Sequence, residues 1–82
     1  MLTIHPGEYL RITYLEPESK TQKSLAKELG VSASAMSRLI EGKSEVSIKM
    51  ALALEEALGR SAESWVMMQV QHSLQEARKK SR

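Results

Sequence analysis

The stretch TQKSLAKELGVSASAMSRLIEGK, residues 21–43, decides the fold of this chain. Its pattern predicts two short helices joined by a tight turn. The apolar residues at helical spacing within it are Leu25, Leu29, Val31, Met36, Leu39 and Ile40. Gly30 stands where the first helix must end, because a left-handed backbone costs least at glycine. Ser32 follows and is expected to cap the second helix. This is the layout of a helix-turn-helix.

In a helix-turn-helix, the second helix enters the DNA major groove. The side chains expected to face bases are Ser32, Ala33, Ser34, Ser37 and Arg38. Those expected to contact the phosphate backbone are Gln22, Lys23 and Lys43. Arg38 has three possible roles: it reaches a guanine edge, contacts a phosphate, or pairs with Glu41 or Glu45. One recognition helix covers few base pairs, so we expect a homodimer reading palindromic half-sites ~34–36 Å apart.

The charge distribution supports a nucleic-acid partner. The whole chain of 82 residues carries a formal net charge of only +2. Between Lys20 and Lys49, however, six basic residues stand against three acidic ones. An isolated lysine is most simply part of a solvated helical face. A local excess of positive charge on the helix-turn-helix itself favours phosphate contacts.

The flanking segments predict three further helices and an all-α domain. Pro6 begins a helix running to about Leu15, whose inward face is expected to hold Tyr9, Ile12 and Leu15, with Leu10 and Tyr14 beside it. Residues 48–58, capped by Ser47 and ended by Gly59, are apolar almost all round, so this helix is expected to be buried by the core or by a partner, and to contact most other helices. The last helix covers about residues 62–78, with Trp65 in the core. Its apolar surface is widened by Met67, Val70 and Leu74, which together with Leu2 suggests a subunit contact.

Composition excludes several other classes of protein. The chain has no cysteine, and its two histidines, His5 and His72, are too few and too far apart for a metal site. His5 is expected at the start of the first helix, and His72 on the last helix. The serines lack a nucleophile elbow or a nearby histidine, so we expect neither an enzyme nor a cofactor. No secretion signal or membrane span is visible, which predicts a cytoplasmic protein.

Taken in order, the motifs of this chain resemble the HigA antitoxin family, within the Cro/repressor-like helix-turn-helix proteins. The motifs are HPGE (5–8), LEP (15–17), SLAKELGV (24–31), MSRLIEGK (36–43) and LGRSAESW (58–65). The resemblance implies a five-helix, lambda-repressor-like fold in a single domain, with the helix-turn-helix at about residues 21–41. It also implies a homodimer that represses its own operon and neutralises HigB, a RelE-type toxin that cleaves messenger RNA.

The departures from the family leave two alternatives open. Family members often carry arginine where this chain has Ala33 and Ala35. The chain could therefore be a toxin-binding protein with a weakened DNA surface. It could also be a stand-alone repressor without a toxin, although the motifs at the two ends of the chain favour the antitoxin.

Overall fold

The computed structural model describes residues 3–15 and 21–80, and these residues form helices joined by short loops, with no strand among them. The helices are α1 (Pro6–Leu10), a π-helical turn η1 (Arg11–Leu15), α2 (Gln22–Leu29), α3 (Ala33–Ile40), α4 (Ile48–Leu58) and α5 (Ala62–Lys80). This confirms the predicted all-α fold. The predicted connection at Pro17 and Glu18–Lys20, and Leu2, lie outside the described residues.

Local capping determines where the helices begin. The Oγ atoms of Thr21, Ser32 and Ser47 accept hydrogen bonds from backbone N–H groups three residues later, each at 3.0 Å. Each bond satisfies one N–H group that the first turn of a helix leaves unpaired. At the other end, Gly59 closes α4 in the left-handed conformation, with φ at 87°. The predicted helix ends in this part of the chain are therefore confirmed to within two residues.

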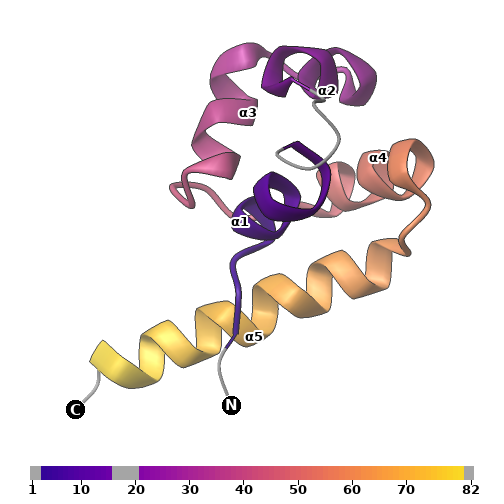
Figure 1. Cartoon of the computed structure of the whole chain (residues 1–82). Helices are drawn as coiled ribbons and strands as arrows, with labels where there is room; N and C mark the ends of the chain where they lie inside the picture. Colours follow the sequence, from indigo (N-terminus) through magenta and orange to yellow (C-terminus); the bar gives the residue numbers. More distant parts are fainter. Residues whose placement is uncertain (1–2, 16–20, 81–82) are drawn as a thin grey trace.

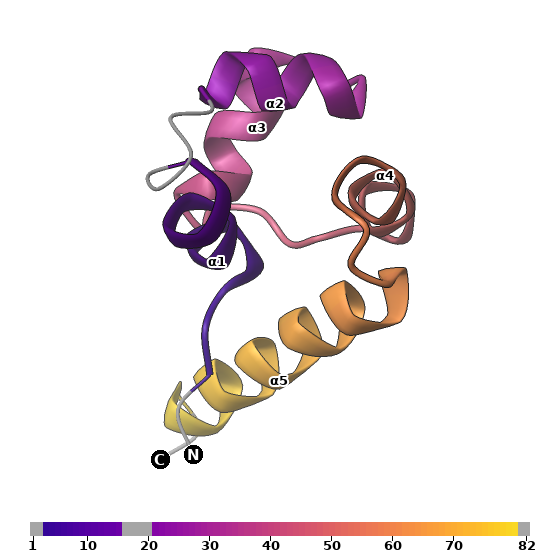
Figure 2. The same ribbon diagram turned by 45° about the vertical axis from the view of Figure 1, so that its right-hand side comes forward.

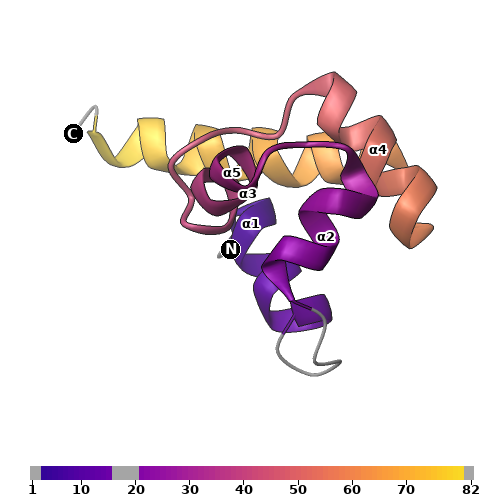
Figure 3. The same cartoon turned by 90° about the horizontal axis from the view of Figure 1, so that it is seen from above.

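The helices are arranged in three layers. Figures 1 and 2 show α2 and α3 on one side and α5 on the other, with α1 and α4 between them. Viewed from above, the C-terminal turns of α5 extend beyond the other helices (Figure 3). The fully or nearly buried apolar side chains meet in one core: Leu10, Leu25, Ala26, Leu29, Met36, Leu39, Val46, Ala51, Leu54 and Trp65.

The first helix corrects the sequence prediction. The chain stays helical to Leu15, but its last five residues form a π-helical turn, in which residues five apart lie on one face. Tyr9 and Tyr14 accordingly make an edge-to-face contact at 6.3 Å between ring centroids. Leu10 is completely buried, whereas Ile12 is 46% exposed. The prediction that Ile12 faces inward is therefore wrong, because it assumed ordinary α-helical spacing.

Helix α4 is less buried than its apolar sequence predicts. It packs on α5 and α2, rather than on most of the other helices. Ala51 and Leu54 are completely buried, but Ile48 is 65% exposed and Leu52 is 53% exposed. The expectation of burial on all sides is wrong within this single chain. The described helices cover only one side of α4, which leaves an apolar ridge in water.

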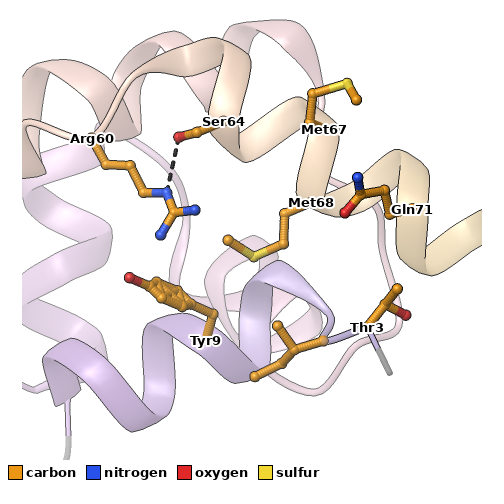
Figure 4. A pocket seen from close by; sticks show the side chains of 8 residues that line it. Thr3, Tyr9, Arg60, Ser64, Met67, Met68 and Gln71 are labelled. Carbon is orange, nitrogen blue, oxygen red and sulfur yellow. Dashed lines mark hydrogen bonds between the residues drawn. The ribbon is translucent and has the colours of Figure 1, made fainter. Parts of the chain in front are cut away.

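Helix α1 is fastened to α5 by an arginine and two aromatic rings. The Arg60 guanidinium lies over the Tyr9 ring, 4.7 Å from its centroid, and 5.5 Å from that of Trp65. Its Nε donates a hydrogen bond of 2.9 Å to Ser64 Oγ, as Figure 4 shows. The indole is completely buried, as the sequence predicts for Trp65. Together with the N-terminal segment, where Thr3 N–H donates to Gln75 Oε1, these contacts fix the orientation of α5.

His5 begins α1 and also holds the loop that follows α3. Its Nδ1 accepts a 2.9 Å hydrogen bond from Gly7 N–H, so the neutral ring carries its proton on Nε2. That Nε2–H donates to Ser44 O at 3.0 Å. His72 of α5 approaches edge-on, with 5.3 Å between the ring centroids. Both histidines occupy the helices predicted for them, and His5 joins three parts of the fold.

We expect mild acid to destabilise the fold through His5. Burial, and then the neighbouring His72, lower the pKa of His5, while Ser44 O, Glu45 and Glu8 oppose this shift more weakly. The unfolded chain therefore takes up the proton first. The contribution of neutral His5 is complete above about pH 6.5 and is lost as the pH falls toward the lower pKa of the folded state.

Melting curves by circular dichroism at pH 7.5 and pH 5.0 test this expectation. His5→Asn should show a smaller fall in Tm than the wild type, because asparagine caps a helix without titrating in this range. His72→Gln controls for the second histidine. If the wild type and His5→Asn lose stability equally, His5 is not the group responsible.

Candidate nucleic-acid interface

The turn between α2 and α3 has the geometry that the sequence predicts. Gly30 adopts φ of 71° and ψ of 30°, in the left-handed region. Its N–H and that of Val31 turn back to the last carbonyls of α2, at 3.2 Å from Lys27 O and 3.0 Å from Ala26 O. Ser32 then begins α3 by capping Ala35 N–H. The two helices are thus set at a fixed angle, as a helix-turn-helix requires.

Helix α3 has one buried face and one exposed face. Met36 and Leu39 are at most 1% exposed and attach the helix to the core. The predicted base-facing residues Ser32, Ala33, Ser34 and Arg38 are all exposed, whereas Ser37 is half-buried. The outward orientation predicted for this helix is therefore confirmed for Ser34 and Arg38. Their roles toward DNA stay predictions.

The predicted phosphate-contacting residues of α2 lie close to the start of α3. Lys23 is exposed and Gln22 is half-buried in the first turn of α2. Lys23 and Ala33 line the same open hollow between the two helices, which measures about 650 Å³. The structure therefore brings one candidate for phosphate contact and one for base contact to the same surface. The basic Lys27 also lines this hollow and was not among the predicted residues.

Glu41 contacts two of the predicted DNA-facing side chains, whereas the sequence analysis considered it only as a possible partner of Arg38. One carboxylate oxygen lies 3.0 Å from Lys43 Nζ, and the other accepts a 3.0 Å hydrogen bond from Ser37 Oγ. The hydrogen bond from Lys43, followed by that from Ser37, lowers the pKa of the Glu41 carboxyl group. Glu41 therefore stays ionised near neutral pH and holds two of the predicted DNA-facing side chains.

The ion pair between Glu41 and Lys43 bears on the possible roles of Arg38. Sequence reasoning allowed Arg38 to pair with Glu41 or Glu45. Instead, Glu41 pairs with Lys43, and within residues 3–15 and 21–80 no ion pair forms at Arg38. Arg38 is exposed, and its guanidinium carries five N–H donors. Such a group can reach a base edge or a phosphate without first breaking an ion pair.

Two other kinds of site find no support in the described part of the chain. No group of three or more histidine, aspartate or glutamate residues there could hold a metal ion. The longest helix, α5, is too polar to cross a membrane, and the shorter helices do not qualify either.

Comparison with known proteins places this geometry in a family. Residues 13–65 match the helix-turn-helix family. Virulence-associated protein I of Dichelobacter nodosus is 38% identical over 77 residues, which cover 94% of this chain and 71% of that protein. The structure of antitoxin GraA has a TM-score of 0.92 and 31% identity, covering 98% of this chain and 86% of GraA.

A third similar protein has a structure that was solved with DNA. The structure of Pseudomonas aeruginosa antitoxin HigA with the higBA promoter has a TM-score of 0.86 and 33% identity. The match covers 93% of this chain and 83% of that one. Since both structural matches span more than nine-tenths of this chain, the similarity includes α5 as well as the helix-turn-helix.

Proposed function

This chain belongs to the HigA group of helix-turn-helix antitoxins, and from that membership we propose that it is an operator-binding antitoxin. As a homodimer it represses its own toxin–antitoxin operon in the bacterial cytoplasm. It also binds and neutralises a HigB-type toxin that cleaves messenger RNA. It acts by binding rather than by catalysis. The exposed face of α3, fixed by buried Met36 and Leu39, carries the DNA-binding part of this proposal.

The proposed DNA contacts follow the exposure of each side chain. Around the start and outer face of α3, the residues that face the bases are Ser32, Ala33, Ser34, Ser37 and Arg38. The residues that contact phosphates are Gln22, Lys23 and Lys43. Arg38 makes the main polar base contact, because alanine offers only a methyl group and serine only one hydroxyl. Glu41 limits the positive charge at the end of α3.

A titration with promoter DNA tests the proposal as a whole. The probe is the duplex immediately upstream of the chain's own gene, labelled for fluorescence anisotropy, with a scrambled duplex of equal length as control. The purified dimer should bind the promoter at least a hundredfold more tightly than the scrambled duplex at physiological salt. Equal affinity for both duplexes would leave only non-specific binding and would contradict a repressor.

We expect Arg38→Ala and Lys43→Ala to weaken binding in different ways. A two-bond contact to guanine discriminates by about 1–3 kcal/mol, so Arg38→Ala should reduce promoter affinity tenfold or more and scrambled-duplex affinity much less. Lys43→Ala should reduce both affinities and lower the slope of log K against log salt by about 0.9. Glu41→Gln is the matched control, and it should change affinity in the opposite direction. It removes the ion pair with Lys43, so the affinities for the promoter and for the scrambled duplex should both rise. Identical behaviour of the two alanine variants would contradict this division of roles.

The dimer is proposed to form through the exposed apolar stripe of α5. This stripe consists of Met67, Val70 and Leu74, which are 53%, 42% and 46% exposed. Their spacing places them on one side of the helix, as expected for a helix–helix seam. If two copies of α5 pair antiparallel about this stripe, Glu63 of one copy approaches Arg78 of the other. In that pairing, opposite charges would meet at both ends of the apolar stripe, which is compatible with a two-fold interface.

One observation favours a second candidate function. Ala33 and Ala35 are exposed on the very face of α3 that would meet DNA, and Glu41 binds two of its polar neighbours. A toxin-binding protein with a weakened DNA surface would have this appearance. It would co-purify with the product of the neighbouring gene but would not bind the promoter in the titration above. A stand-alone repressor would instead bind the promoter and lack a toxin gene beside its own.

A further inference from the structure

The loop between α3 and α4 carries Lys43, and its inner side is tied to α5. Val46 is 8% exposed, and its backbone N–H donates a buried 2.9 Å hydrogen bond to Gln69 Oε1. These two residues are 23 positions apart, so the bond joins the exit of the recognition helix to the middle of the last helix. A buried N–H group without a partner is costly, which makes this bond a strong constraint on the loop.

A second contact from the next turn of α5 reinforces the first. Gln69 is only 6% exposed, and its Nε2 donates to Ser73 Oγ at 3.1 Å. Ser73 Oγ in turn donates to Glu45 Oε2 at 3.3 Å. Two successive turns of α5 thus hold two successive residues of the loop. The amide of Gln69 uses both its acceptor and a donor in this arrangement.

The loop has space into which it can move if these contacts are lost. A pocket of about 470 Å³ lies beside it. The pocket is bounded by residues of the loop and of α5, including Lys43, Glu45, Gln69 and Ser73. On the other side of the loop, the Lys43 backbone N–H donates to Arg38 O at 2.8 Å. Between Val46 and Lys43 the loop is held at Ser44 O by His5 Nε2–H. Gln69 therefore fixes the α4 end of this three-residue span, and a displacement of Val46 would change the path of the chain from Lys43 to Val46.

We propose that Gln69 is a positioning residue for operator binding. It does not touch DNA itself, and it holds the loop so that Lys43 meets a phosphate. The inference rests on the proposed function, because it assumes that the loop contacts the operator. If it holds, α5 contributes to DNA binding indirectly, although it lies on the side of the molecule opposite to α2 and α3.

The test measures promoter affinity at several salt concentrations for Gln69→Leu. Leucine keeps much of the buried volume but cannot accept the Val46 hydrogen bond. We expect promoter affinity to fall about tenfold and the salt slope to fall by about one phosphate contact, as for Lys43→Ala. Gln71→Leu is the matched control, since Gln71 is exposed on the same helix and should behave as wild type.

A double-mutant cycle separates positioning from a general loss of structure. If Gln69 acts through Lys43, then Gln69→Leu should weaken binding little further in a Lys43→Ala background. Additive losses, or an unchanged salt slope for Gln69→Leu, would overturn the proposal. Hydrogen exchange of the Val46 amide should also become faster in Gln69→Leu and stay slow in Gln71→Leu.

A second variant covers the case in which Gln69→Leu does not fold. Ser73→Ala removes the hydrogen bonds of Ser73 to Glu45 and to Gln69 Nε2 from a half-buried position, but it leaves the bond from Val46 N–H to Gln69 Oε1. It should therefore fold and show a smaller loss of the same kind. Wild-type affinity and salt slope in Ser73→Ala, with Gln69→Leu unfolded, would overturn the proposal. Failure of the wild type to bind its promoter would instead contradict the proposed function.

Discussion

Replacing Gly7 by alanine is expected to destabilise the fold by about 3 kcal/mol or more. Alanine normally stabilises a helix relative to glycine by about 0.5–1 kcal/mol. Here, a Cβ on Gly7 would lie 1.7 Å from Leu39 O, 2.6 Å from Leu39 C and 3.0 Å from Ile40 Cα. These are backbone atoms at the end of α3, so they cannot rotate away as a side chain could. Overpacking of a core typically costs about 1–3 kcal/mol, and a clash with backbone belongs at or beyond the upper end.

Urea unfolding of Gly7→Ala, followed by circular dichroism, measures this effect. An 82-residue domain has a total stability of only about 4–12 kcal/mol. The variant should therefore unfold at a much lower urea concentration than the wild type. Gly59→Ala is the control: no atom lies within 4 Å of its new Cβ, and only the positive φ is unfavourable, at about 1–2 kcal/mol. A Gly7→Ala variant as stable as the wild type would mean that α1 and α3 do not meet as described.

Val70→Asp is expected to separate the dimer and to abolish tight operator binding. The substitution places a charge in the middle of the α5 stripe, where it would be buried without a partner in the proposed interface. When one subunit has bound its half-site, the other subunit is held close to the second half-site, but only while the two subunits are joined. This linkage typically contributes a factor of 10²–10⁴ in affinity, and we expect a loss in that range.

Light scattering after size-exclusion chromatography, together with the promoter titration, tests this expectation. The wild type should have the mass of two chains at micromolar concentration, and Val70→Asp the mass of one. Ile48→Asp is a matched control, because it places the same charge on another exposed apolar residue, on α4. It should leave both the dimer and promoter affinity intact. If Ile48→Asp breaks the dimer and Val70→Asp does not, the interface is the α4 ridge.

Much of the fold could be predicted because it depends on local chemistry. Thr21, Ser32 and Ser47 cap helices through bonds to residues three positions away, and Gly30 and Gly59 end helices by their own conformation. These interactions are visible in a short window of sequence. The π-helical turn after Leu10 was not visible, because nothing in the residues 11–15 distinguishes it from an α-helical turn.

The candidate site was predicted in outline but not in its contacts. Helical spacing sufficed to place Arg38 outside and Met36 inside. The Glu41–Lys43 pair could have been suspected, since two opposite charges follow the helix closely, but its geometry depends on how Gly42 turns the chain. The role of Gln69 was not predictable, since its partner Val46 lies in another element and a glutamine on an amphipathic helix is ordinarily in solvent.

The layer of α1 and α4 separates α3 from α5, so the proposed base contacts and the proposed dimer stripe lie on different helices, far apart in the sequence. In the proposed complex, side chains on α3 would select the bases within a half-site. The packing of α5 in the proposed dimer would set how far apart, and at what relative rotation, two such half-sites must lie. If both roles hold, a change in either helix alone would separate this protein from a relative with a similar operon, and a subunit with a foreign α5 would fail to pair even if its α3 were identical.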